Sequence, residues 1–204
     1  MAKPIEDEPG SAMHVHQSVV DVKSGRNIFS DDNGKPSDAF FAFIGGQQKY
    51  LPAAMCILAP YVNSYRRLTR EFGNPVNTHW GYDNRTTGLR IPASPPEARR
   101  VENRVPSSDA NPYLAVAACL ACGYLGMMEN LRPTDPTEGN ARLLPFNLPR
   151  GLLDAVQIFE ECGPLREIFG EPFATSYKVV KETEFETFMR VISPWEREYL
   201  LLNV

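Results

Sequence analysis

The sequence predicts an α/β fold (α+β in arrangement) in which an antiparallel sheet portion packs with helices and the C-terminal half is helical. Period-two alternation across residues 14–18 and a strand–turn–strand pattern across residues 86–105 predict the sheet. Apolar residues at helical spacing from residue 112 onward predict the helices. At 204 residues the chain is long enough for one hydrophobic core.

The composition is that of an ordered globular protein, with 43% hydrophobic and 23% charged residues. A net charge of −4 gives no reason to expect nucleic acid as a partner, and no apolar run reaches membrane-spanning length. Cys119 and Cys122 form a Cys-x-x-Cys inside an apolar, Ala-rich stretch, which favours buried reduced thiols over a redox or zinc site. Reduced cysteines fit a cytoplasmic location.

The N-terminal part begins with a small-residue turn at residue 10 and continues as a strand to about residue 20. Alternation places His14, His16 and Ser18 on one face of this strand. Two histidines at positions i and i+2 can point at one metal ion, although exposed pairs without a metal are also common. Residues 24–35 follow as a hairpin-like loop.

The first helix is predicted to start at an N-cap Asp38, run to about Tyr50 and stop at Pro52, with a second helix over 53–62. Gly45 and Gly46 indicate close packing against another element. Residues 69–77 are expected to be irregular. The next helix starts at Pro112, capped by Asn111 or Asp109, and its apolar sequence over 113–131 predicts burial on all sides.

The C-terminal part follows a Pro- and Gly-rich loop over residues 133–149. Residues 150–162 are predicted to form an amphipathic helix, and residues 164–169 a short one. Residues 173–202 continue as a helix interrupted at Ser193-Pro194. These elements are interpreted as structural. The apolar face of the first of them is predicted to consist of Leu152, Leu153, Val156 and Phe159.

Residues 79–113 hold five arginines, although the whole chain has 21 basic against 25 acidic residues. Period two places Arg100, Glu102 and Arg104 on one face of the second strand. Such a face is costly to bury without partners, and it suits a polar cavity that holds an anion and a metal. From spacing alone, a surface hairpin with salt-bridged charges explains the pattern equally well. The five arginines are Arg85, Arg90, Arg99, Arg100 and Arg104.

Five stretches, in order and at matching spacing, resemble the C-terminal half of the catalytic domain of the glutamine synthetase family. They are residues 10–18, 63–68, 84–92, 99–104 and 109–114. The string Trp-Gly-Tyr-Asp-Asn-Arg-Thr at 80–86 is most similar to the γ-glutamylputrescine synthetase (γ-glutamylpolyamine ligase) branch. The resemblance implies that residues 1–204 are the C-terminal part of such a catalytic domain, with the glutamine synthetase catalytic-domain fold in truncated form.

The resemblance implies a ligase that uses ATP, with Mg²⁺ or Mn²⁺, to join an amine or ammonia to the γ-carboxylate of glutamate through γ-glutamyl phosphate. Such chemistry needs metal ions and guanidinium groups where phosphoryl charge develops. Carried over by position, the resemblance implies four roles. His14 and Glu102 would bind metal, and Arg67 and Arg104 would hold glutamate. Arg85 would handle the transferred phosphate, and the nucleotide and its phosphates would be bound by His16, Ser18, Arg90 and Arg100.

The sequence departs from the family at a flap, where Gly73 stands in place of a glutamate that binds ammonium. Glu71, two residues away, could replace that glutamate only if the flap is rearranged. Loss of an acidic ammonium site favours a larger amine as the nucleophile. The absence of tyrosine from residues 140–149 argues against control by adenylylation of that loop.

The resemblance also implies a missing part, since the family has an N-terminal β-grasp domain and an earlier catalytic segment that carries further carboxylate ligands. Two ligands are too few for a magnesium site unless ATP and water complete it. The family's active site lies between subunits of a ring, so we expect a homo-oligomer when intact and little activity from this chain alone. The alternatives are a structural or assembly half without activity, and an unrelated metal- or anion-binding protein.

Overall fold

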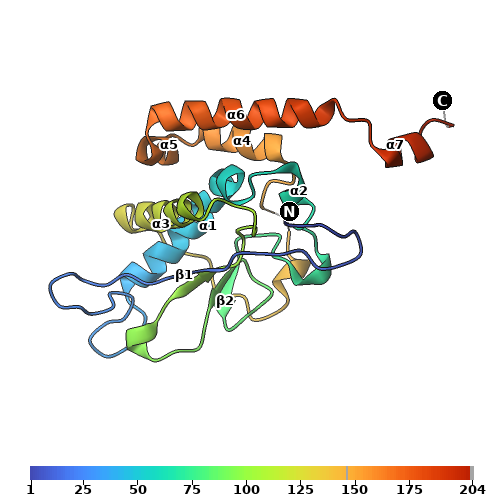
Figure 1. Ribbon diagram of the computed structural model, residues 1–204. Helices are drawn as coiled ribbons and strands as arrows, with labels where there is room; N and C mark the ends of the chain where they lie inside the picture. Colours follow the sequence, from blue (N-terminus) through green and yellow to red (C-terminus); the bar gives the residue numbers. More distant parts are fainter. Residues whose placement is uncertain (146, 203–204) are drawn as a thin grey trace.

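The computed structural model describes residues 1–145 and 147–202 and shows a small sheet below two layers of helices (Figure 1). The strands β1 (Val15–Gln17), β2 (Trp80–Tyr82), β3 (Leu89–Ile91) and β4 (Val101–Asn103) lie in the order β1-β4-β3-β2. The pairs β1–β4 and β3–β4 are antiparallel, as predicted, but β2 and β3 are parallel. The sheet is therefore mixed, because residues 83–88 double back before β3 begins.

The predicted alternation is present in the two strands that carry the polar residues. His16 lies opposite Glu102 in the register of β1 and β4. Side chains at the intervening positions, Val15, Val101 and Asn103, are buried on the helical side of the sheet. One face of the sheet thus serves the core, and the opposite face carries the charged residues.

Helix α1 (Asp38–Leu58) is continuous, so the predicted break at Pro52 is wrong. Its N-cap is Ser37, whose hydroxyl accepts from the Phe40 amide at 3.2 Å, and not Asp38. Pro52 lacks the N–H that would donate to the carbonyl of Gln48. Thr78 replaces that donor, since its Oγ1 donates to the Gln48 carbonyl at 3.3 Å. A tertiary contact thereby stabilises a helix that local sequence would end.

Thr78→Val is expected to lower the free energy of unfolding by about 1 kcal/mol, because it leaves the half-buried Gln48 carbonyl without a donor. In a Pro52→Ala background the restored amide can donate instead, and the cost of Thr78→Val should shrink. Urea denaturation of the four proteins of this cycle measures the coupling. Thr78 also accepts from Asn147, and that loss is common to both backgrounds. Equal costs in the two backgrounds would contradict the assigned role of Thr78.

Helix α3 (Pro112–Met128) packs against α1 through glycines, as the Gly45-Gly46 pair predicted. A Cβ placed on Gly46 would lie 2.2 Å from the Cys122 carbonyl oxygen and 2.6 Å from Gly126 Cα. The prediction that α3 is buried on all sides is wrong. Its small residues face α1, while no described element covers the opposite side. The exposed residues there include Tyr113, Val116, Leu120, Tyr124 and Met128.

The N-cap of α3 and the burial of its two cysteines are as predicted from the sequence. Asn111 caps α3 by accepting from the amide of Tyr113 at 3.0 Å, with Pro112 in the first turn. Cys119 and Cys122 are free and buried, and burial raises the pKa of Cys119 to about 12. The free, buried state of these thiols agrees with the prediction, and a thiol with such a pKa stays protonated at neutral pH.

The remaining helices form the outer layer and the C-terminal extension (Figure 1). Leu153 is 44% exposed and does not lie on the buried face of the helix that holds it. The predicted helix over 53–62 is replaced by the end of α1 and a short separate helix. No helix among the described residues is both long and apolar enough to cross a membrane. The elements are α2 (Val62–Tyr65), α4 (Leu152–Glu161), α5 (Gly163–Phe169), α6 (Glu171–Met189) and α7 (Pro194–Tyr199), with one-turn 3₁₀ helices at Glu71–Gly73, Pro96–Ala98 and Ala141–Leu143.

Candidate active site

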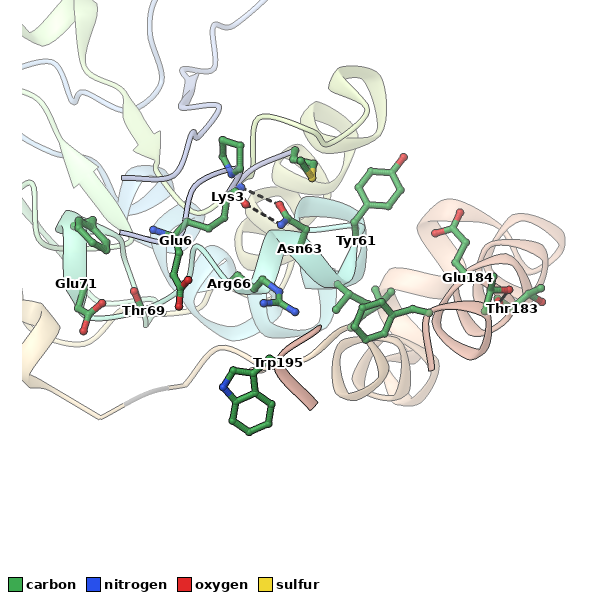
Figure 2. A pocket seen from close by; sticks show the side chains of 17 residues that line it. Lys3, Glu6, Tyr61, Asn63, Arg66, Thr69, Glu71, Thr183, Glu184 and Trp195 are labelled. Atoms are coloured by element: carbon green, nitrogen blue, oxygen red, sulfur yellow. Dashed lines mark hydrogen bonds between the residues drawn. The ribbon is translucent and has the colours of Figure 1, made fainter. Parts of the chain in front are cut away.

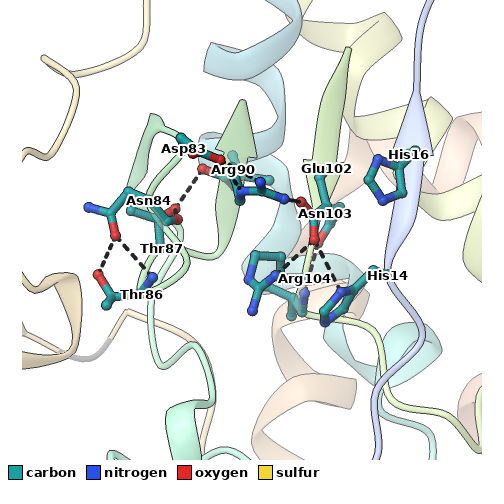
Figure 3. Close-up of polar contacts among 12 residues, drawn as sticks. His14, His16, Asp83, Asn84, Thr86, Thr87, Arg90, Glu102, Asn103 and Arg104 are labelled. Carbon is teal, nitrogen blue, oxygen red and sulfur yellow. Dashed lines mark hydrogen bonds and ion pairs between the residues drawn. The ribbon is translucent and has the colours of Figure 1, made fainter. Parts of the chain in front are cut away.

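Glu102 on β4 is the centre of the charged face of the sheet (Figure 3). Its Oε1 lies 2.8 Å from Nη1 of Arg104 and 3.1 Å from Nδ1 of His14. Its Oε2 accepts from Nη1 of Arg90 at 2.6 Å. Glu102 is 2% exposed, so these groups compensate a carboxylate that is almost removed from water.

The strand register explains why these side chains meet. Arg90 lies directly opposite Glu102 in the β3–β4 pair, and His14 precedes the strand that pairs with β4 on its other side. Arg104 follows β4 and returns to the same face two residues after Glu102. Three neighbouring strands therefore each direct a side chain at one carboxylate.

Burial and charge act in opposite directions on this cluster. Burial alone would raise the pKa of Glu102, but hydrogen bonds and charges from Arg90 and Arg104 outweigh it and hold that pKa below its ordinary value. Burial and the charge of Arg104 lower the pKa of His14, against the opposing effect of Glu102. At neutral pH the carboxylate is thus ionised and the imidazole neutral, and both can then donate electron pairs to a cation.

Two of the predicted nucleotide residues, His16 and Arg100, lie beside this centre, since His16 is opposite Glu102 in the strand register. Nδ1 of His16 accepts from Nε of Arg100 at 3.3 Å. Ser18 and Arg85 are exposed, and neither forms a hydrogen bond or ion pair with any described residue. The structure therefore brings six of the nine predicted site residues into direct contacts, in two groups: His14, Arg90 and Arg104 around Glu102, and the pair of His16 and Arg100.

Arg67 takes a different position from the other predicted arginines. It is 1% exposed, and it donates to the Val105 carbonyl and to Oγ of Ser107, the latter at 3.4 Å. Burial lowers the pKa of Arg67 to about 10, and the charge of Asp109 opposes this change. Gly10 packs on it, since a Cβ there would lie 2.7 Å from Arg67 Cγ. Its role in holding glutamate stays a prediction, because a ligand would have to enter this buried position.

Two residues that sequence reasoning did not select complete the charged face. Asp83, just after β2, accepts from Nε of Arg90 at 3.1 Å. Asn84 donates to the carbonyls of Thr137 and Gly139 at 2.9 and 2.8 Å, and so holds residues 137–139 beside the turn that carries Arg85. Asp and Asn are common in turns, so the Asp83-Asn84 pair was the sequence feature that could have indicated a turn here.

A hollow of about 1020 Å³ lies elsewhere, among the N-terminal segment, α2, α6 and α7 (Figure 2). Its walls include aromatic and charged side chains, but none of the predicted site residues. Glu71 lines this hollow, so the structure does not show it on the Glu102 face. The hollow is therefore separate from the charged cluster, which lies on the sheet, and its volume alone does not make it the active site.

Comparison of the chain with known proteins identifies its family. Residues 1–200 match the family model described as glutamine synthetase, catalytic domain. The chain belongs to this family. The fold and the C-terminal-half resemblance inferred from sequence are thereby confirmed.

Relatives within the glutamine synthetase family include both amine ligases and glutamine synthetases. The chain is 39% identical over 206 residues to γ-glutamylputrescine synthetase PuuA of Escherichia coli (strain K12), covering 100% of this chain and 43% of that protein. It is 36% identical to type-1 glutamine synthetase 2 of Dictyostelium discoideum, covering 98% of this chain and 40% of that protein. A solved structure titled "Apo GmaS without ligand" superimposes with a TM-score of 0.86 at 31% identity, covering 98% of this chain and 47% of that chain. The chain spans less than half the length of these relatives.

The donor atoms fit part of the metal site that the glutamine synthetase family implies. Two ligands about 2.1 Å from one ion and at right angles lie roughly 3 Å apart. His14 Nδ1 and Glu102 Oε1 are 3.1 Å apart, which matches that geometry. Among the described residues, no three His, Cys, Asp or Glu side chains gather as a metal-binding group. The pair could therefore hold a metal that takes its other oxygens from phosphate, water or further residues.

Proposed function

We propose that this chain carries the phosphate- and metal-binding side of an enzyme that uses ATP to join an amine or ammonia to the γ-carboxylate of glutamate. The observation that supports it best is the cluster around Glu102. Arg90, Arg100 and Arg104 lie on or beside it. The hydrogen bond from Arg90 lowers the pKa of Asp83, and the charge of Arg85 contributes to lowering it. Against the carboxylates of Glu102 and Asp83, these four arginines leave two positive charges to attract an anion.

The reaction proposed is a two-step ligation. The γ-carboxylate attacks the terminal phosphorus of ATP, ADP leaves, and γ-glutamyl phosphate forms. The amine then attacks the acyl carbon, the bond to phosphate breaks, and the amine loses a proton. Arg85 is exposed and not paired with any described residue, so its guanidinium is available for the transferred phosphoryl group. Mg²⁺ or Mn²⁺ at His14 and Glu102 would neutralise phosphate charge.

The nucleophile is proposed to be an amine larger than ammonia, of the polyamine class. Gly73 stands where the resemblance expects an ammonium-binding glutamate, and Glu71 lines the separate hollow. A larger amine brings its own binding contacts and depends less on such an acid. The similarity to the E. coli γ-glutamylputrescine synthetase supports this class.

Assembly is part of the proposal, because the chain spans less than half of its relatives. We propose that an intact enzyme is a homo-oligomer whose active site needs residues beyond those of this chain. The second candidate is a chain that acts as a structural half without activity. The incomplete set of metal ligands among the described residues favours that alternative.

Isothermal titration of MgATP into this chain tests the nucleotide side of the proposal. Binding heat is expected, and Arg100→Ala should weaken affinity by about tenfold, the effect of one lost charge-assisted hydrogen bond to a phosphate oxygen. Arg26→Ala is the matched control, since Arg26 pairs with Asp32 in an exposed ion pair on the loop before α1. Equal affinities of the two variants would contradict the assignment of Arg100.

Catalysis is tested in a chimera that joins this chain to the N-terminal part of the E. coli γ-glutamylputrescine synthetase that it does not match. Phosphate release should require both glutamate and putrescine. Arg85→Ala should lower its rate by about two orders of magnitude, as loss of a group that stabilises transition-state charge does. Activity in the chimera without MgATP binding to the chain alone would mean that the nucleotide site is completed by the N-terminal part. A folded chimera without ligase activity would contradict the ligase proposal.

A further inference from the structure

Asp83 lies at the end of β2 with a φ of 47°, in the left-handed region. Residues other than glycine seldom adopt this conformation, and Asp and Asn tolerate it best. The Asp83 amide donates to the Ile91 carbonyl at 2.8 Å, which extends the pairing of β2 with β3 by one residue. This backbone directs the Asp83 carboxylate at Arg90 on the neighbouring strand (Figure 3).

The Asp83 carboxylate occupies one whole edge of the Arg90 guanidinium. Nε of Arg90 donates to Oδ1 of Asp83 at 3.1 Å, and Nη2 donates to the same oxygen. Nη1 donates to Oε2 of Glu102 at 2.6 Å. A guanidinium has five N–H donors, so these bonds leave one N–H on each terminal nitrogen. Such a pair of donors matches two oxygens of a phosphate group.

The Asp83–Arg90 pair differs from an ordinary surface ion pair. In the Arg26–Asp32 pair both side chains are exposed, and such pairs contribute little. The Arg90 side chain is half-buried and is held by carboxylates on two sides, from Asp83 and from Glu102. It cannot rotate without losing at least one of these contacts, so its free donors have a fixed direction.

We propose that Asp83 is a positioning residue that blocks the Nε edge of Arg90, so that Arg90 meets a phosphoryl group through its terminal nitrogens alone. This inference rests on the proposed function, in which Arg90 binds phosphates of ATP, and it adds a residue that touches no substrate. Asp83 acts through Arg90, and its own carboxylate is 63% exposed. The ligand class is a polyphosphate, which inorganic pyrophosphate represents.

The experiment follows the Nε–Hε NMR signal of Arg90 in ¹⁵N-labelled chain during titration with pyrophosphate. Loss of a signal in Arg90→Lys assigns it. In the wild type, pyrophosphate should shift the terminal Nη signals and leave the Nε–Hε signal nearly unchanged. In Asp83→Gly, which permits the left-handed backbone and removes the acceptor, the Nε–Hε signal should shift without ligand and respond to pyrophosphate. In Asp83→Asn the amide oxygen can still accept from Nε, so the signal should shift without ligand through loss of the charge but respond to pyrophosphate less than in Asp83→Gly. Asp32→Asn is the matched control and should behave as the wild type.

The outcomes separate this inference from the proposed function. An Nε–Hε signal that is the same in the wild type and in both Asp83 variants overturns the positioning role. A signal that moves in the variants, with a wild-type Arg90 that ignores pyrophosphate at every nitrogen, contradicts the phosphate role of Arg90 instead. Two variants of different size keep the readout available if one of them fails to fold.

Discussion

Glu102→Ala is expected to lower the free energy of unfolding by about 3–5 kcal/mol, the cost of removing one partner from a buried ion pair. The carboxylate faces Arg90, Arg104 and His14, and its side chain is 3% exposed. Its loss leaves Arg104 without its ion-pair partner, and Nε of Arg104 already lacks a hydrogen bond. The same variant should abolish binding of MgATP. Urea denaturation and calorimetric titration measure the two effects.

Glu129→Ala is the matched control for this experiment. Glu129 also meets two donors, Lys49 and Tyr50, but its side chain is 33% exposed. Solvent screening makes such a pair worth about 1 kcal/mol or less. Similar losses in Glu102→Ala and Glu129→Ala would contradict the view that the Glu102 cluster is desolvated. Glu102→Gln, which keeps the side-chain volume, should fall between the wild type and alanine in stability.

Gly46→Ala is expected to lower the free energy of unfolding by about 2–3 kcal/mol, because the α1–α3 contact has no room for a methyl group. The added Cβ would lie 2.2 Å from the Cys122 carbonyl oxygen, on the backbone of the facing helix. Backbone atoms cannot rotate away as a flexible side chain would, so the helices must separate. Thermal and urea denaturation measure the loss.

Gly139→Ala provides the comparison, since no heavy atom lies within 4 Å of a Cβ at that position. It should change stability little. Gly126 faces Gly46 in the same contact, so Gly46→Ala and Gly126→Ala should cost less in combination than the sum of the single variants. A Gly46 variant as stable as the Gly139 variant would show that the two helices can adjust without loss.

Sequence reasoning located most of the charged cluster because period two is a local property. It placed His14 with His16, and Arg100 with Glu102 and Arg104, on common faces before any partner strand was known. The residues that contact those faces from other strands could not be predicted in this way. Nothing in the spacing of residues 83 and 90 says that Asp83 adopts a left-handed backbone and reaches Arg90.

The fold shows the same limit. The N-cap position of Asn111 and the packing of Gly46 were predictable from single residues. The continuity of α1 through Pro52 depends on Thr78, which lies 30 residues from the carbonyl that it satisfies. The burial of Arg67 likewise depends on Val105 and Ser107, far along the chain. Contacts between distant residues decide these cases, and periodicity carries no information about them.

The strand β1 also determines when the charged cluster can form during folding. Arg100 and His16 are 84 residues apart in sequence, and closing a flexible loop of that length costs about 4 kcal/mol of chain entropy. β1 has three residues and lies at the end of the strand order, so few contacts repay that cost. The contact of Gly46 with Gly126 closes a loop of similar length, but it joins two long helices, so we expect the α1–α3 pair to assemble first and β1 to join β4 later. By the same reasoning we expect β1 to detach before the helical core in local unfolding, which would take His14 and His16 away from Glu102 and Arg100.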